Sequence, residues 1–378
     1  MSTAITRRIF AGALGAAAGA TLLDSKLARA AATAARSDLP EDVVRLNANE
    51  NPYGPSAKAL EAFERSNRIA NRYPDSLESE MREALAKHHG VDSRRIVLGC
   101  GSSEILMMAD TAFLGPGKNA VAAEPTFEAV LEFAGVVRAR AIKVPLTADF
   151  RHDLPRMAKA CEENTGLVYV CNPNNPTGTI VTGDELSAFA DRVPASATIL
   201  VDEAYHHFVE DPRYKTACGL IEKHPNVVVA RTFSKIYGMA GLRLGYAVGS
   251  EQRISQLSRY ASWSNANAAV LTAALASLAD ADLVPRLRRT FNDTRRWLIA
   301  TMTQRGRRVI PSETNFVMIE VGSDVTPIIR AFREKKILVG RKFPSLATWL
   351  RVTIGKREEM EAFVAAFSHI VQAKEAAA

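Results

Sequence analysis

The sequence predicts an α/β fold in which a large domain is built on a mostly parallel sheet and a smaller α/β domain follows it. Three observations lead to this prediction. The 378 residues are too many for one ordinary small domain. Short apolar segments rich in β-branched residues alternate with longer helical patterns, which is typical of strands joined by crossover helices. After about residue 270 the pattern changes to long helices with a few strands.

The first 30 residues are typical of an export signal. Arg7 and Arg8 precede an Ala/Gly-rich apolar stretch from Ala11 to Leu23, and Ala28-Arg29-Ala30 offers the small residues that a signal peptidase reads. The paired arginines resemble a twin-arginine signal. We therefore expect export to the periplasm or cell exterior, and a cytoplasmic protein if the signal is not used; a disordered Ala-rich extension is the alternative. The stretch is too short to cross a membrane, and no permanent membrane span is expected.

The elements of the main sheet follow in order. Five strands are expected, at Arg95–Leu98, Asn119–Ala122, Leu167–Val170, Thr198–Val201 and Val227–Ala230. Helical patterns occur at Leu77–His88, Glu104–Ala112 and Asp184–Asp191, and two later strands are expected at Asn315–Ile319 and Trp349–Thr353. The chain then divides into the signal segment 1–30, an N-terminal arm 31–74, a large domain 75–270 and a small domain 271–378.

Charge gives no indication of a nucleic-acid partner. The net charge is +7, and residues 1–30 carry four basic residues and one acidic residue, so the predicted folded body is only modestly basic. The densest basic segment, Arg286 to Arg308, includes Arg288, Arg289, Arg295 and Arg296, and among them lie Phe291, Trp297, Leu298 and Met302 at helical spacing. This pattern favours a long helix with one apolar stripe and one solvated basic face over a polyanion site.

Four cysteines show no metal-ligand spacing, and no metal site is expected. Cys100 and Cys171 end apolar segments, where small buried thiols are common. Cys161 and Cys218 are the other two, and the sequence leaves open whether any pair forms a disulfide.

Lys235 is the first residue with a candidate chemical role. It lies shortly after the Val227–Ala230 strand, and Arg243 follows eight residues later among glycines that permit tight turns. A lysine that forms a Schiff base has to lie in a partly desolvated pocket. Arg243 suits a phosphate dianion, and Thr232 and Ser234 add hydroxyl donors. A surface lysine is the alternative for this motif taken alone.

Two polar motifs follow neighbouring strands. Asp202 ends the Thr198–Val201 strand, where a buried carboxylate needs a partner such as a protonated pyridine nitrogen, and Tyr205 would reach the phenolic oxygen of the same ring. A helix cap or structural ion pair is the alternative for Asp202. Cys171–Gly178 is a loop fixed by two prolines and a glycine, and it holds Asn175 ready to donate to that phenolic oxygen.

Two further motifs complete the set. Gly99-Cys100-Gly101-Ser102-Ser103 follows a strand and precedes a helix expected to start at about Glu104. Ser102, Ser103 and the N–H groups at the start of the helix could bind a phosphate. A plain helix cap is the alternative. Phe127 follows another strand, where it either stacks on a pyridine ring or is an ordinary core aromatic. The ends of parallel strands meet at one edge of a sheet, so we expect all five motifs to form one site.

Taken together, these motifs make the chain similar to the class I/II aminotransferases of pyridoxal-phosphate fold type I, and within them to histidinol-phosphate aminotransferases. The resemblance covers about Val44 to Ala365. Its most specific strings are Leu46–Gly54, Asn71–Asp75, Cys171–Gly178, Asp202–Tyr205, Lys235–Arg243 and Trp349–Gly355. The resemblance implies an enzyme that moves an amino group between a small-molecule amino donor and a 2-oxo acid, working as a homodimer.

The family's roles carry over residue by residue. Lys235 carries pyridoxal phosphate and later shuttles a proton. The other cofactor contacts implied are Asp202, Asn175, Tyr205, Phe127, Ser102, Ser103, Thr232, Ser234 and Arg243, with Tyr73 from the neighbouring subunit. Substrate contacts are implied for Tyr53, Asn49, Arg341 and Arg351, of which Arg351 receives the anionic group. The family commonly has tyrosine where this chain has Phe127, and an acidic residue within the phosphate turn that Gly-Ser-Ser-Glu replaces here.

Several alternatives stay open at this level. Related enzymes of the same fold type decarboxylate or cleave their substrates, and a non-catalytic regulator would be expected to carry a DNA-binding domain. An exported solute-binding protein would not need Lys235 and Asp202 together. The leading substrate by resemblance is histidinol phosphate, with Arg341 as a second charge for its phosphate. Aromatic amino acids follow closely, because an exported enzyme would rarely meet a cytosolic intermediate.

Overall fold

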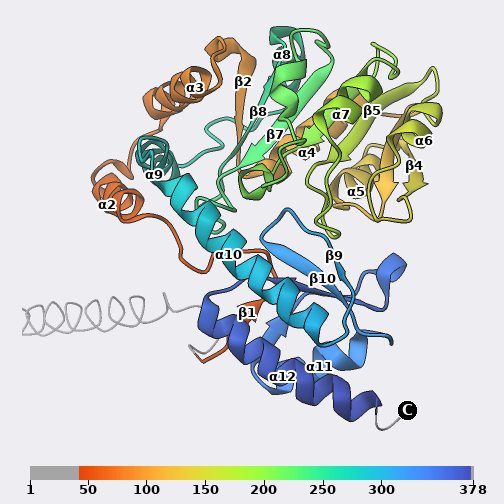
Figure 1. The fold of residues 1–378 in the computed structure, drawn as a ribbon. Coiled ribbons are helices and arrows are strands. Elements are labelled where there is room, and N and C mark those ends of the chain that lie inside the picture. The colour runs from red at the N-terminus through yellow and green to blue at the C-terminus, as the bar shows by residue number, and fades with distance from the viewer. Residues whose placement is uncertain (1–41, 376–378) are drawn as a thin grey trace, which may run out of the picture. The chain divides into compact units, whose positions relative to one another are not determined.

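The computed structural model describes residues 42–375. The expected signal segment 1–30, with residues 31–41 of the expected arm, lies outside the described residues. Elements are labelled as in Figure 1.

A seven-stranded sheet forms the larger part of the described chain (Figure 1). Its strands lie in the order β2-β8-β7-β6-β5-β3-β4, and only β8 runs against the others. Their bounds are β2 Ile96–Gly99, β3 Asn119–Glu124, β4 Arg140–Pro145, β5 Thr165–Cys171, β6 Thr198–Asp202, β7 Val227–Thr232 and β8 Gly245–Gly249. The mostly parallel sheet and all five expected strands are confirmed.

The sequence missed two strands of this sheet. β4 is mostly exposed and includes Arg140 and Lys143, so it lacks the continuous apolar pattern of the central strands. β8 begins and ends with glycine, and Gly245 is one of the glycines around Arg243 that were expected to permit tight turns. It is instead the first residue of β8, opposite Gly99 and Thr232.

Helices cover both faces of the sheet because side chains alternate along each strand. Leu167 and Tyr169 of β5 pack in one core with α4, α5 and α8, while Val168 and Val170 pack in a second core with α3, α6 and α7. The helix bounds are α2 Ala57–Ser66, α3 Asp75–His89, α4 Ser102–Phe113, α5 Ala129–Val136, α6 Leu154–Lys159, α7 Gly183–Ala190, α8 Glu251–Ser258 and α9 Ala268–Leu278. The three expected helices are confirmed, with α4 starting two residues before Glu104.

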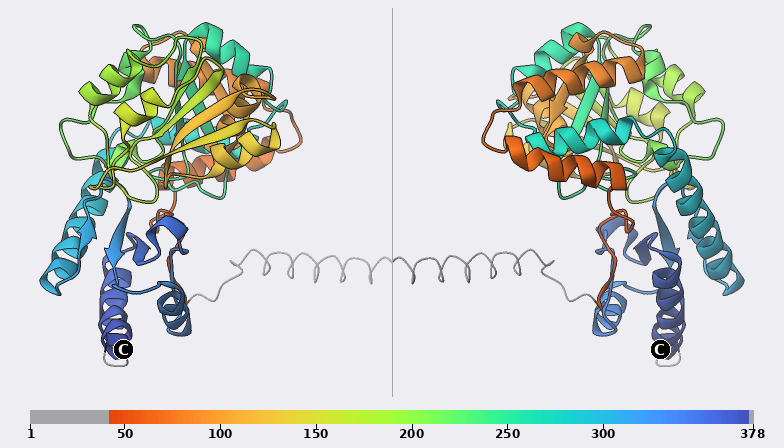
Figure 2. Two further views of the ribbon diagram at one scale, coloured as in Figure 1. Left: turned by 90° about the vertical axis from the view of Figure 1, so that its right-hand side faces the viewer. Right: turned by 90° about the vertical axis from the view of Figure 1, so that its left-hand side faces the viewer.

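The C-terminal part has its own small sheets. β9 Val309–Ile310, β10 Phe316–Glu320 and β12 Trp349–Thr353 form an antiparallel sheet, and β11 Ile337–Val339 pairs in parallel with β1 Val44–Leu46. The long α10 Leu283–Gln304 leads from the large sheet into this part, which also holds α11 Thr326–Glu334 and α12 Arg357–Glu375 (Figures 1 and 2). The domain limits at 74 and 270 stay predictions.

Among residues 42–375, no single helix is long and apolar enough to cross a membrane, and one pair, α9 with α10, passes by length and composition only when its two helices are joined across a bend of 84°.

Two expectations about individual residues were wrong. The α10 helix is present, but Arg295 does not belong to a solvated face: its side chain is 3% exposed, donates to the Thr314 carbonyl at 2.9 Å and pairs with Glu210 and Glu313 at 3.3 Å. These acidic partners come from other segments, so the helical spacing alone could not reveal them. Cys100 is exposed, because it lies in the turn after β2; Cys171 is buried as expected, and all four cysteines are free.

Candidate active site

The motif residues meet at one edge of the large sheet, as expected from the strand ends. They surround a pocket of about 270 Å³. The residues expected from the sequence that line it are Asn49, Ser102, Ser103, Phe127, Asn175, Asp202, Tyr205, Thr232, Ser234, Lys235, Arg243, Arg341 and Arg351. Residues from both the large sheet and the C-terminal part therefore build one site.

Lys235 follows β7 and turns its amine toward the N-terminal segment of the chain. Its Nζ donates to the carbonyl of Asn49 at 3.2 Å. Burial, and after it the positive charge of Arg351, lower the pKa of Lys235 from 10.5 to about 8. A lysine amine is nucleophilic only when unprotonated, so this environment prepares Lys235 for attack on a carbonyl carbon.

Asp202 lies at the end of β6 and is 3% exposed. The Tyr169 hydroxyl donates to its Oδ2 at 2.9 Å, and the backbone N–H of Ala204 donates to its Oδ1 at 3.1 Å. Burial raises the pKa of Asp202, while these two hydrogen bonds and the charge of Lys235 oppose the rise. The two hydrogen bonds fix the orientation of the Asp202 carboxylate, which can pair with a cationic group in the pocket.

Sequence reasoning missed Tyr169. It is fully buried in β5, whose parallel register places Cys171 beside Asp202. The signal was one phenolic hydroxyl within the apolar stretch Leu167–Cys171, two residues before the strand ends at Cys171. A buried tyrosine hydroxyl needs a partner, and the next strand supplies one.

Tyr205, Asn175 and Asn49 are further polar residues that line the same pocket as Asp202. The Asn49 side chain donates to the Tyr205 hydroxyl at 3.1 Å. The Oδ1 of Asn175 accepts from Nη1 of Arg351 at 2.8 Å, which leaves the Asn175 amide nitrogen as a donor toward the pocket. Asn49 is buried and has a left-handed φ of 55°, a conformation that asparagine tolerates better than most residues.

The start of α4 and Arg243 form an anion cradle. Ser102 is the first residue of α4, and Gly101 precedes it with a φ of 78°. A Cβ on Gly101 would lie 2.1 Å from Nη2 of Arg243, so only glycine leaves the guanidinium its place. Arg243 also donates to Ser234 Oγ at 3.3 Å. Helix N–H groups, hydroxyls and a guanidinium around one space are the donor set that a phosphate dianion requires.

The residues fit pyridoxal phosphate on the geometry of this chain. Arg243 of the anion cradle and the Asp202 carboxylate both line the pocket. Asp202 is buried and forms no ion pair among the described residues. Phe127 and Lys235 line the same space. Each group matches one feature of the cofactor: phosphate, pyridine nitrogen, ring face and aldehyde.

Two arginines of the C-terminal part face the cofactor space. Arg351 lies in β12, is 8% exposed, and its Nη2 donates to the Asn47 carbonyl at 2.9 Å. Arg341 lies after β11 and is ion-paired with Glu128. Both guanidinium groups lie over the ring of Phe343, at 5.1 Å for Arg351 and 4.3 Å for Arg341.

Two expected residues do not line the pocket of their own chain. Tyr53 is 40% exposed and packs edge-on against Phe291, with ring centres 5.8 Å apart. Tyr73 is 85% exposed and lies in a surface hollow together with Trp263, which is 98% exposed. The contact of Tyr53 with the substrate stays a prediction, and so does the contact of Tyr73, which was expected with the site of a second subunit.

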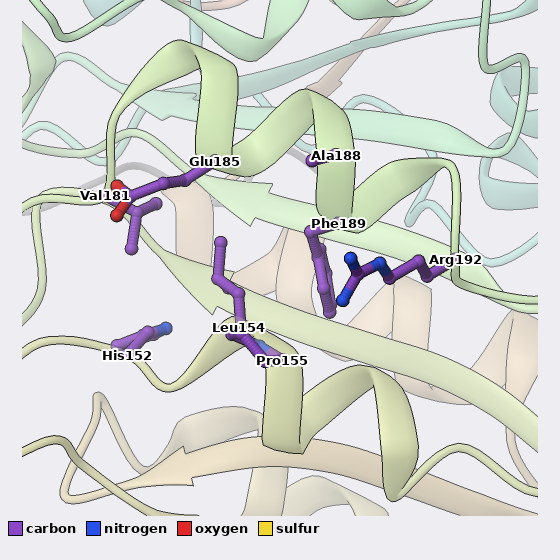
Figure 3. Close-up of a pocket in the computed structure, with 8 residues that line it drawn as sticks. All are labelled: His152, Leu154, Pro155, Val181, Glu185, Ala188, Phe189 and Arg192. Atoms are coloured by element: carbon purple, nitrogen blue, oxygen red, sulfur yellow. The ribbon is translucent and has the colours of Figure 1, made fainter.

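A second pocket of about 170 Å³ lies between α6 and α7 (Figure 3). It contains none of the motif residues; its lining is His152, Leu154, Pro155, Val181, Glu185, Ala188, Phe189 and Arg192. The two ring nitrogens of His152 are buried without a hydrogen-bond partner. The nearby Asn174 side chain is already engaged with Thr126 and Thr177. Among residues 42–375, no group of three or more His, Cys, Asp or Glu side chains is placed to hold a metal ion.

Comparison with known proteins places these features in context. Residues 41–367 match the family model described as aminotransferase class I and II. A histidinol-phosphate aminotransferase of Moorella thermoacetica is 39% identical over 334 residues, covering 88% of this chain and 86% of the relative. An aromatic amino acid aminotransferase of Cutibacterium acnes is 39% identical over 289 residues, covering 76% and 82%. The crystal structure of histidinol-phosphate aminotransferase from Sinorhizobium meliloti, in complex with pyridoxal-5'-phosphate, superposes with a TM-score of 0.82 at 27% identity, covering 88% and 91%.

Proposed function

The chain belongs to the class I and II aminotransferases and is a pyridoxal-phosphate-dependent transaminase of fold type I; from this premise we propose that it transfers the amino group of histidinol phosphate, or of a similar donor, to 2-oxoglutarate. The observation that carries the proposal is the convergence of Lys235, Asp202 and Arg351 on one pocket. Lys235 supplies the nucleophile, Asp202 the counter-charge and Arg351 the binding group for a substrate anion.

The chemistry divides between the cofactor and the chain. Pyridoxal phosphate, when bound, supplies an electron sink that stabilises negative charge on the carbon bearing the amino group. Asp202 would hold a proton on the pyridine nitrogen, and Tyr169 keeps that carboxylate oriented. Asn175 and Tyr205 would hold the phenolic oxygen. Once released from the cofactor, the Lys235 amine would accept a proton from the donor carbon and return it at the neighbouring position, a task suited to a group whose pKa is lowered to about 8.

Arg351 supports the choice of an anionic donor but does not distinguish a carboxylate from a phosphate. Histidinol phosphate leads because several relatives between 34% and 39% identical are named histidinol-phosphate aminotransferases. Aromatic amino acids are the second candidate, because a relative named aromatic amino acid aminotransferase is equally identical, although over a shorter stretch.

The test is a comparison of kcat/KM for histidinol phosphate and for phenylalanine with 2-oxoglutarate as acceptor. A ratio above one supports histidinol phosphate as the donor, and a ratio far below one rejects it while leaving transamination intact. Turnover that depends on the 2-oxo acid separates transamination from decarboxylation or side-chain cleavage.

A homodimer is part of the proposal. Tyr73 and Trp263 are large, highly exposed aromatic side chains that share one surface hollow with the start of α9. Exposed aromatic clusters of this kind commonly mark protein interfaces. The family resemblance assigns Tyr73 to the phosphate site of the neighbouring subunit, which accounts for its distance from the pocket of its own chain.

Export is proposed from Arg7, Arg8 and the apolar stretch that follows them. Cell fractionation of the chain with its full N-terminus is expected to find the enzyme outside the cytoplasm, shortened after Ala30. Replacing Arg7 and Arg8 together by lysine is expected to keep it in the cytoplasm. Full-length cytoplasmic protein in both cases would reject export.

A further inference from the structure

Glu128 lies at the edge of the active-site pocket. It directly follows Phe127, which lines the pocket, and directly precedes α5. Its carboxylate does not cap α5 but is ion-paired with Arg341, another pocket-lining residue. The Glu128 and Arg341 side chains are 42% and 52% exposed, so the pair is at the mouth rather than at the base of the pocket.

The charge of Glu128 reaches the group that binds the substrate anion. Burial lowers the pKa of Arg351 to about 10; the positive charge of Arg341 adds to this effect, and the negative charge of Glu128 opposes it. The two arginines also share the ring of Phe343. Glu128, Arg341 and Arg351 therefore act on the same small region of the pocket.

The sum of these charges bears on the kind of anion that the pocket accepts. Arg341 and Arg351 together carry two positive charges, which match a phosphate dianion. Glu128 neutralises one of them, and the remaining charge on Arg351 matches a single carboxylate. If Arg341 stays paired with Glu128 while it contacts a phosphate, its charge is already neutralised by that carboxylate. If Arg341 turns to the phosphate instead, the freed Glu128 carboxylate repels the dianion at short range.

We propose that Glu128 is a specificity-determining residue that favours amino donors with one carboxylate over donors with a phosphate group. The role of Glu128 rests on the proposed function, because it selects among donors for the same transamination. With Glu128 present, the preference for histidinol phosphate over aromatic amino acids is smaller than it would be with Arg341 and Arg351 alone.

The Arg341–Glu128 ion pair could also act only by holding two segments together, and the chain offers a matched control for that role. Ser345 donates from its hydroxyl to Oε1 of Glu124 at 3.1 Å, which joins the same two segments as the Arg341–Glu128 pair. Neither Ser345 nor Glu124 lines the pocket. Loss of this second link in Ser345→Ala weakens the contact between the segments without changing the charge near Arg351.

The experiment measures the donor half-reaction of the holoenzyme, without any 2-oxo acid, so that the anionic acceptor does not contribute. The rate of loss of the cofactor's absorbance is followed with histidinol phosphate and with phenylalanine for the wild type, Glu128→Gln, Glu128→Lys and Ser345→Ala. Glu128→Gln is expected to raise the ratio of second-order rate constants, histidinol phosphate over phenylalanine, by roughly threefold to fivefold, the size expected for one exposed charge. Glu128→Lys is expected to raise it further, and Ser345→Ala to leave it unchanged.

The outcomes separate the two levels of the proposal. Suppose that the wild type reacts with either donor, but Glu128→Gln and Glu128→Lys both keep the wild-type ratio of rate constants. The role of Glu128 is then overturned, and transamination stands. An equal shift in Ser345→Ala overturns it as well, since the effect then comes from the contact between segments. If the wild type reacts with no amino donor, the proposed function itself fails. A melting temperature within about 2 °C of the wild type, which is the shift of a small change in stability, verifies that each variant is folded.

Discussion

The backbone of Gly245 lies against the backbone of Ser102 so closely that a Cβ on Gly245 would be 2.3 Å from the Ser102 nitrogen. The contact joins the start of β8 to the start of α4, and it sets the position of the helix N–H groups beside Arg243. The geometry of the anion cradle thus depends on Gly245, which contributes no side chain to it.

Gly245→Ala is therefore expected to weaken cofactor binding by tenfold or more, because backbone atoms cannot yield to the new methyl group as a side chain can. Gly241→Ala is the matched control, since a Cβ there meets nothing within 4 Å. The measurement is the dissociation constant of pyridoxal phosphate from titration of each apoenzyme. Equal affinity in the two variants would show that the close contact does not position the cradle.

Lys235 supplies a pH-dependent prediction for the apoenzyme. Its pKa is lowered from 10.5 to about 8, by burial first and then by Arg351. The amine is therefore protonated and unreactive below about pH 8 and becomes nucleophilic above it, so the rate of covalent cofactor uptake should rise with pH and level off above this value. Arg351→Gln should move the midpoint upward, and Arg351→Lys, which keeps the charge, should leave it near the wild-type position. A wild-type midpoint near 10.5 would contradict the pocket's effect on Lys235.

His152 supplies a prediction about stability (Figure 3). Burial lowers its pKa from 6.5 to about 4. Between these values the unfolded chain binds a proton that the folded chain does not, so the neutral ring's contribution is complete above about pH 6.5 and is lost as the pH falls toward 4. At pH 5 the loss is on the order of 2 kcal/mol.

Replacing His152 by phenylalanine removes this proton and also removes two buried ring nitrogens that lack partners. The fall in the free energy of unfolding between pH 7.5 and pH 5 should therefore be smaller in His152→Phe than in the wild type, as measured by urea denaturation. An unchanged pH dependence would mean that the ring is protonated or solvated in the folded protein.

Tyr73 tests the shared site of the proposed dimer. A Lys235→Ala chain and a Tyr73→Ala chain should each be nearly inactive alone. After mixing and subunit exchange, mixed dimers have one site with both residues intact, so activity should recover to about a quarter of the wild-type value. No recovery in demonstrated mixed dimers, or full activity in a wild-type monomer, would count against a site built from two subunits.

The strand ends explain why much of the site was predictable from sequence. Parallel strands bring their carboxyl ends to one edge, so residues as far apart as Ser102 and Lys235 were expected together and are together. Local turn chemistry also identified the loop that holds Asn175. These features depend on short stretches of chain and on a general property of parallel sheets.

Other features depend on partners that sequence spacing does not reveal. The link between Glu128 and Arg341 joins residues 213 positions apart through two partly exposed side chains. Arg295 follows the spacing of a solvated helix face, yet Glu210 and Glu313 reach it from other segments. β8 was missed because glycine lowers strand propensity, and only the close approach to Ser102 explains why glycine is needed there.

The central claim is that Lys235 is the residue that binds pyridoxal phosphate covalently. The most direct measurement is borohydride reduction of the holoenzyme, followed by digestion and mass spectrometry of the labelled peptide. The expected result is a pyridoxyl group on Lys235, with no labelled peptide and no transamination in Lys235→Ala. A pyridoxyl group on a different lysine, or full transamination by Lys235→Ala, would contradict the assignment of this pocket as the active site.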